Sequence, residues 1–283
     1  MLIVIYITIF VKKKNKYMLI EGIKYNNSSN SFEIDFNNNN SIDIIKINEI
    51  PIHQTKLGKH TYFYGYKIED KIPSEIKNKF VNCIKNIDTK QVNEKDFYTL
   101  VNNAVSNLDE NIDLFNFSVI VYPESRSKLN VFLSNEISRR INNPELVSIE
   151  LLKNLKDNIT FDTNRFKTNV IELKNENGKF LRDSTTRKVL GAIPDKIIKK
   201  IKNNDYFSIS SITKYRDYIN NFLIFKTIED ENLFKTLINK DVLIIDDVST
   251  SGSTLDECIK VIRSVNQTNH IVVFSLIGNN KYL

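Results

Sequence analysis

The segment DVLIIDDVSTSGSTLDECIKVI, residues 241–262, joins an apolar run, two adjacent carboxylates, a cluster of small polar residues and a regularly spaced apolar pattern. Residues 242–245 are apolar without polar alternation, which is typical of a strand that is covered on both faces of a parallel sheet. After Thr254 the apolar residues recur at helical spacing. The segment therefore predicts a strand, a loop and a helix, in that order.

The same order of elements occurs earlier in the chain. Residues 117–121 (FSVIV) form another apolar run, and residues 129–141 carry apolar side chains at helical spacing. Further strands are expected at residues 146–152, 221–225 and 271–276, with helices between several of them. Alternation of strands and helices predicts an α/β fold with a parallel sheet.

The first part of the chain has a different pattern. Residues 61–68 (TYFYGYKI) predict an aromatic strand, and apolar spacing predicts helices at residues 74–87 and 94–108. We therefore expect an N-terminal α+β region of unknown role over residues 1–111. The α/β domain is expected to follow over residues 112–283.

Composition restricts the partners and the cellular setting. A net charge of +6 over 283 residues suits phosphate-bearing ligands but does not by itself indicate a nucleic-acid partner, and none is expected. Only two cysteines occur, so we expect neither a disulfide framework nor a zinc site, and we infer a reducing, cytoplasmic setting. The apolar residues 1–11 are too few to span a membrane and predict a strand, with Met18 as an alternative start of the chain.

The small residues after the acidic pair predict a phosphate site. In a parallel sheet, ligands bind beyond the carboxyl ends of the strands, where helix N-termini present free N–H groups. Gly252 lets the backbone approach an anion closely, and the neighbouring hydroxyls add donors. Asp246 and Asp247 would repel a phosphate, so they are expected to meet sugar hydroxyls or a hard cation such as Mg²⁺. A ribose 5-phosphate meets both requirements.

The stretch VLIIDDVSTSGSTL, residues 242–255, resembles the phosphoribosyl pyrophosphate (PRPP) signature of type I phosphoribosyltransferases. The likeness extends over residues 113–283, and Ser251 stands where the family commonly has a threonine. The resemblance implies transfer of the ribose 5-phosphate of PRPP to a nitrogen acceptor, with Mg²⁺ as cofactor and pyrophosphate as product. The implied partners are PRPP and a small-molecule acceptor such as a nucleobase, and a homodimer is left open.

The same resemblance implies a role for each residue of the motif. Asp246 and Asp247 are expected to be both catalytic and metal-binding. The 5-phosphate is expected to bind Ser249, Thr250, Ser251, Gly252, Ser253 and Thr254. The pyrophosphate is expected to bind the loop after the first strand, through Ser125, Arg126, Ser127 and Lys128. An alternative for Ser127 is that it only caps the following helix.

Two further alternatives remain open. The polar insertion at residues 153–220 is either a lid over the site or a solvated extension with its own helices. The alternative function is a non-catalytic regulatory protein that binds PRPP or a nucleotide on the same fold. A nucleotide hydrolase is not expected, because neither Gly58 nor Gly178 belongs to a GxxxxGK[ST] motif.

Overall fold

A computed structural model describes the chain over residues 17–20, 23–26, 29, 31–34, 52–55, 58–67, 74–85, 92–125, 127–203, 215–249, 252–267 and 269–278. The strand expected at residues 1–11 lies outside these residues. The central sheet consists of β4 (Ile52–Thr55), β5 (Gly58–Lys67), β6 (Phe117–Pro123), β7 (Val147–Lys153), β10 (Leu223–Phe225), β11 (Asp241–Val248) and β12 (Ile271–Gly278). The apolar runs of the sequence thus form the strands that they predict.

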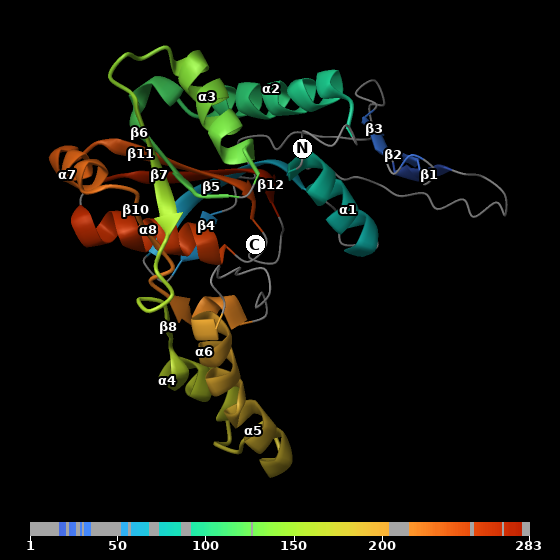
Figure 1. The fold of residues 1–283 in the computed structure, drawn as a ribbon, viewed down its shortest axis with the longest axis vertical. Helices are drawn as coiled ribbons and strands as arrows, with labels where there is room; N and C mark the ends of the chain where they lie inside the picture. Colours follow the sequence, from blue (N-terminus) through green and yellow to red (C-terminus); the bar gives the residue numbers. More distant parts are fainter. Residues whose placement is uncertain are drawn as a thin grey trace. The chain divides into compact units, whose positions relative to one another are not determined.

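The central sheet is mostly parallel. Its spatial order is β10-β7-β6-β11-β12-β5-β4 (Figure 1). Neighbouring strands from β7 to β5 pair in parallel, whereas β4 pairs with β5 in the antiparallel sense. The expected α/β fold class is therefore confirmed.

Helices cover both faces of this sheet. They are α1 (Ser74–Lys85), α2 (Glu94–Asn111), α3 (Leu129–Ile141), α7 (Ile228–Thr236) and α8 (Ser253–Val265). Figure 1 shows α2 and α3 on one side of the sheet and α8 on the other. Buried residues of α1, α2 and α3 share one core with Leu243 and Ile245 of β11. Because side chains alternate along a strand, Ile244 and Asp246 point to the opposite face, where α8 lies.

The order of the strands creates a switch point between β6 and β11. From β6 the chain moves outward to β7 and β10, returns to β11 beside β6, and continues to β12 in the other direction. The segments that follow β6 and β11 therefore lead to α3 and α8 on opposite faces of the sheet. In doubly wound sheets, ligands bind in the crevice at the carboxyl ends of such a strand pair.

Strands β4 and β5 of the N-terminal region belong to this same sheet. Strand β5 pairs in parallel with β12, and the Tyr66 hydroxyl of β5 donates a hydrogen bond to the Leu100 carbonyl of α2 at 2.6 Å. A Cβ at Gly65 would lie 2.7 Å from the Cβ of Ala104, so β5 and α2 are in close contact. The first compact unit comprises Met1–Leu151 and Phe225–Leu283. A small antiparallel sheet precedes β4 in sequence, formed by β1 (Tyr17–Ile20), β2 (Ile23–Asn26) and β3 (Ser31–Ile34).

The second compact unit, Leu152–Ile224, nearly coincides with the expected insertion. Phe166 is fully buried in it, and its ring lies 5.1 Å from that of Tyr218. The unit contains β8 (Thr160–Phe161), α4 (Thr163–Phe166), the π-helical turn η4 (Lys167–Ile171), α5 (Ser184–Gly191), α6 (Ile193–Asn203) and β9 (Ile219–Asn220). Throughout the described part of the chain, each helix is too short or too polar to cross a lipid bilayer.

Candidate active site

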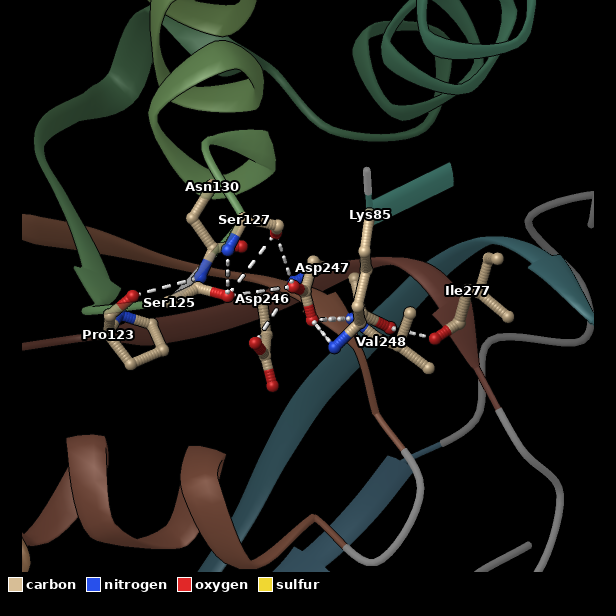
Figure 2. Close-up of polar contacts among 10 residues, drawn as sticks. Lys85, Pro123, Ser125, Ser127, Asn130, Asp246, Asp247, Val248 and Ile277 are labelled. Carbon is tan, nitrogen blue, oxygen red and sulfur yellow. Dashed lines mark hydrogen bonds and ion pairs between the residues drawn. The ribbon is translucent and has the colours of Figure 1, made fainter. Parts of the chain in front are cut away.

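The acidic pair lies at the carboxyl end of β11, beside the end of β6. Both carboxylates belong to the strand itself and are buried. Because Asp246 and Asp247 are consecutive strand residues, their side chains project from opposite faces of the sheet. Figure 2 shows this divergence: Asp246 points away from the group of side chains that converges on Asp247.

Asp247 accepts hydrogen bonds at both of its carboxylate oxygens. Its Oδ1 lies 2.8 Å from the Nζ of Lys85 and accepts the Val248 N–H at 2.7 Å. Its Oδ2 accepts the hydroxyls of Ser125 and Ser127, each at 3.1 Å (Figure 2). With a side chain only 4% exposed, Asp247 is a buried carboxylate whose charge is balanced by one ammonium group and three neutral donors.

The loop after β6 brings its serines to Asp247 because its backbone is held at both ends. The Asn130 side chain, in the first turn of α3, donates to the Pro123 carbonyl at 2.9 Å. Helix α3 begins after Lys128, and no side chain forms a capping hydrogen bond at its N-terminus. The alternative in which Ser127 caps this helix is therefore wrong, since its hydroxyl donates to Asp247 instead.

Asp246 lies among hydroxyl groups on the other face of the sheet. It is in register with Ser275 of β12, and its Oδ1 accepts the Asp247 N–H at 3.0 Å. The Ser275 hydroxyl is 2.6 Å from that of Tyr62 on β5. Burial raises the pKa of Tyr62 well above its ordinary value, the charge of Asp246 raises it further, and hydrogen bonds to Ser249 and Ser275 oppose the shift. Tyr62 is therefore a neutral hydroxyl close to Asp246.

The expected phosphate loop connects β11 to α8. Ser249 is buried, and its N–H donates to the Ile277 carbonyl at 2.9 Å. Gly252 has a positive φ of 68° and precedes the first residue of α8, the buried Ser253, with Thr254 next in the helix. A left-handed glycine directly before a helix turns the chain so that the first N–H groups of the helix face the loop.

The remaining expected site residues have different positions. Lys128 is exposed directly before α3. Arg126, Thr250 and Ser251 lie outside the described residues. The structure thus brings Ser125 and Ser127 to Asp247, whereas Asp246 lies among other hydroxyls.

The acidic pair does not form a ready-made metal site. The two carboxylates diverge, and the described residues contain no group of three or more Asp, Glu, His or Cys side chains that could hold a metal ion. Mg²⁺ commonly binds through one or two carboxylates together with substrate phosphates. The residues present fit a Mg²⁺ ion that the phosphates of a ligand also hold, with one oxygen from either carboxylate.

Lys85 is the site residue that sequence reasoning missed. It is the last residue of α1, outside the segment that resembles the PRPP signature. A lysine in the last turn of a helix ordinarily indicates only a favourable interaction with the helix dipole. The contact becomes visible only when α1 is packed on the same face of the sheet as Asp247.

Neither the scan against protein-family models nor the search of curated proteins gives a match for this chain.

Proposed function

We propose that this protein transfers the ribose 5-phosphate of PRPP to a nitrogen acceptor, with release of pyrophosphate. The observation that carries the proposal is the contact of Ser125 and Ser127 with Asp247 across the switch point between β6 and β11. This contact links the loop after β6, which suits one phosphate group, to β11. Strand β11 in turn leads to the second loop, which contains Gly252. A sugar that carries phosphates at both ends fits such a pair of loops.

The second loop supports a site for the 5-phosphate. Gly252 directly precedes the N-terminus of α8, where the helix dipole favours an anion. Ser253 and Thr254 are the first residues of that helix and carry hydroxyl donors. On this proposal the 5-phosphate lies against α8, and the pyrophosphate lies against the loop that leads to α3.

The reaction requires no covalent nucleophile from the protein. The acceptor nitrogen bonds to the anomeric carbon while the bond from that carbon to the pyrophosphate oxygen breaks, and the nitrogen releases its proton to solvent. Asp246 and Asp247 orient the ribose and stabilise the positive charge that develops on it. Bound Mg²⁺ would neutralise part of the charge on the leaving pyrophosphate. Ser125, Arg126, Ser127 and Lys128 are the groups proposed to hold that leaving group.

Calorimetric titration tests the ligand first. PRPP is titrated into the full chain with and without Mg²⁺, and ribose 5-phosphate and inorganic pyrophosphate are titrated separately. Mg²⁺-dependent binding that favours PRPP is the expected result, and a screen of nucleobases for pyrophosphate release follows. Absence of binding for all three ligands would refute the proposal.

Substitution of the acidic pair tests the chemistry. Asp247→Ala should abolish most of the turnover, and Asp241→Ala is a matched control because Asp241 lies on the same strand at its opposite end. Full turnover by the Asp247→Ala variant would remove this residue from the mechanism. Cys83 and Cys258 are buried thiols that form no disulfide with each other, which supports placement in the reducing cytoplasm.

One observation favours a second candidate function, a regulatory protein that binds PRPP or a nucleotide without catalysis. Both oxygens of Asp247 already accept hydrogen bonds from protein groups, so a ribose hydroxyl or a metal must share or displace them. PRPP binding without pyrophosphate release, for every acceptor tested, would establish this second function.

A further inference from the structure

The ammonium group of Lys85 is placed to do more than balance a buried charge. Its Nζ lies 2.8 Å from Asp247, yet the Lys85 side chain is 32% exposed while that of Asp247 is 4% exposed. An ammonium group has three N–H donors, and Asp247 takes one of them. The other two donors can therefore serve an incoming ligand at the carboxyl edge of the sheet.

The charges around the switch point require a cation there. Asp246 and Asp247 bring two negative charges to a site whose proposed ligand is itself a polyanion. Repulsion between such groups in a partly buried site is costly unless a cation lies between them. Among the described residues, Lys85 is the basic side chain that contacts the acidic pair.

The face of the sheet determines which phosphate group Lys85 can reach. Residues of α1 share the core with α3 and with Leu243 and Ile245, so Lys85 approaches Asp247 from the face of α3. Ser125 and Ser127 reach Asp247 from the loop that leads to α3. The loop that contains Gly252 instead leads to α8, on the opposite face of the sheet (Figure 1). Lys85 therefore lies on the same face as the loop that carries Ser125 and Ser127.

We infer that Lys85 is a ligand-binding residue that bridges Asp247 to an anionic oxygen of the pyrophosphate group. This inference depends on the proposed function, because it assigns a residue to one part of the PRPP molecule. It gives the segment before β6 a direct role in the site. Lys85 binds the leaving-group side of the ligand and does not contact the 5-phosphate.

Calorimetry with Lys85→Met and Lys85→Arg tests the assignment, and Lys79→Met is the control. Lys79 lies on the same helix, is 39% exposed and pairs with Glu75, away from Asp247. Lys85→Met should weaken binding of PRPP and of inorganic pyrophosphate roughly ten- to hundredfold, the loss expected for one charge-assisted hydrogen bond. Binding of ribose 5-phosphate should change less than about twofold, and Lys85→Arg should keep most of the affinity because it keeps the charge.

A second measurement uses the unaltered chain and so does not depend on whether a variant folds. The protein is labelled with an amine-reactive reagent with and without saturating PRPP, and labelling is quantified by mass spectrometry. PRPP should protect Lys85 and leave Lys79 unchanged. Unchanged labelling of Lys85 at saturation would overturn the inference.

The outcomes separate the inference from the proposed function. Equal weakening of all three ligands by Lys85→Met would show a structural role only and overturn the inference, as would unchanged affinity for pyrophosphate. In both cases the unaltered chain still binds PRPP, so the proposed function stands. If the unaltered chain binds none of the three ligands, the proposed function fails and the inference fails with it.

Discussion

The Lys85–Asp247 ion pair should respond unequally to removal of its two partners. Lys85→Met leaves a carboxylate that is 4% exposed without its counterion, whereas Asp247→Asn leaves an ammonium group on a side chain that is 32% exposed. The lysine can regain water, but the aspartate cannot. We therefore expect Lys85→Met to destabilise the folded protein more than Asp247→Asn does.

The magnitudes follow from burial and from the donors that remain. Removing one partner of a fully buried pair costs roughly 3–5 kcal/mol. The carboxylate keeps the two serine hydroxyls and the Val248 N–H, and Lys85 is partly hydrated, so Lys85→Met should cost about 2–3 kcal/mol. In Asp247→Asn the serine hydroxyls can turn to accept hydrogen bonds from the new amide, so the expected cost is about 1 kcal/mol.

Urea unfolding measures both free energies. The chain has no tryptophan, so far-UV circular dichroism is the global probe, and hydrogen exchange of peptides from β11 assigns the transition to the first compact unit. The free energies of unfolding are compared only between variants for which the slope of this free energy against urea concentration is unchanged. Lys79→Met controls for loss of a lysine from α1.

The double variant Lys85→Met/Asp247→Asn decides the argument. Once the buried charge is gone, loss of Lys85 should cost little, so the double variant should be more stable than Lys85→Met alone. The single costs should exceed the double cost by about 1–2 kcal/mol. Additive costs, or a larger cost for Asp247→Asn than for Lys85→Met, would refute the claim that Asp247 is a buried anion neutralised by Lys85.

Three further predictions test the packing of the N-terminal segment. Gly65→Ala should lower the free energy of unfolding by about 1–3 kcal/mol, because the added Cβ would be too close to α2. The control Gly191→Ala should be neutral or slightly stabilising, because nothing lies within 4 Å of its added Cβ. Equal urea midpoints for the two variants would contradict the contact between β5 and α2. Burial raises the pKa of Tyr62 and of Tyr66. In the folded protein both hydroxyls therefore stay protonated above a pH of about 10, where the tyrosines of an unfolded chain ionise. Stability should therefore be intact below that pH and fall as the pH rises above it, and tyrosinate absorbance that develops fully without unfolding would count against buried hydroxyls. Burial raises the pKa of Cys83 to about 11, so this thiol should react with a disulfide reagent at pH 8 only after unfolding, and rapid reaction of the folded protein would show that it is accessible.

The sequence predicted the local elements well because their signals are local. Residues 242–245 and 271–276 are uninterrupted apolar runs, and both form buried strands. The helix expected at residues 129–141 has those bounds because its apolar residues follow the helical repeat and a left-handed Asn142 ends it. The aromatic strand at residues 61–68 was also recognised as a strand. The sequence does not show that this strand belongs to the main sheet, because its partner β12 lies more than two hundred residues further along the chain.

The candidate site was predicted only in part, because some of its contacts join residues that are far apart in the sequence. The motif marks Asp246 and Asp247, but the expected strand ended before them, whereas β11 continues to Val248 and so directs the two side chains to opposite faces of the sheet. The hydroxyl of Ser127 could satisfy either the helix N-terminus or a distant carboxylate, and sequence spacing does not distinguish these partners. Lys85 has no local signal, because its role depends on how α1 packs against β11.

The segment before β6 places a group near each of the two carboxylates. Lys85 of α1 contacts Asp247 on one face of the sheet, while Tyr62 of β5 bonds to Ser275 near Asp246 on the other. Asp247 thus has an ion-pair partner from residues 58–85, and Asp246 lies near a hydroxyl from the same segment. A separate recognition domain would not need to supply such groups to the end of a strand that lies beyond residue 240. We therefore assign the N-terminal segment to the candidate site, and a chain that begins at β6 should lose the charge balance of Asp247 together with strands β4 and β5 of the sheet.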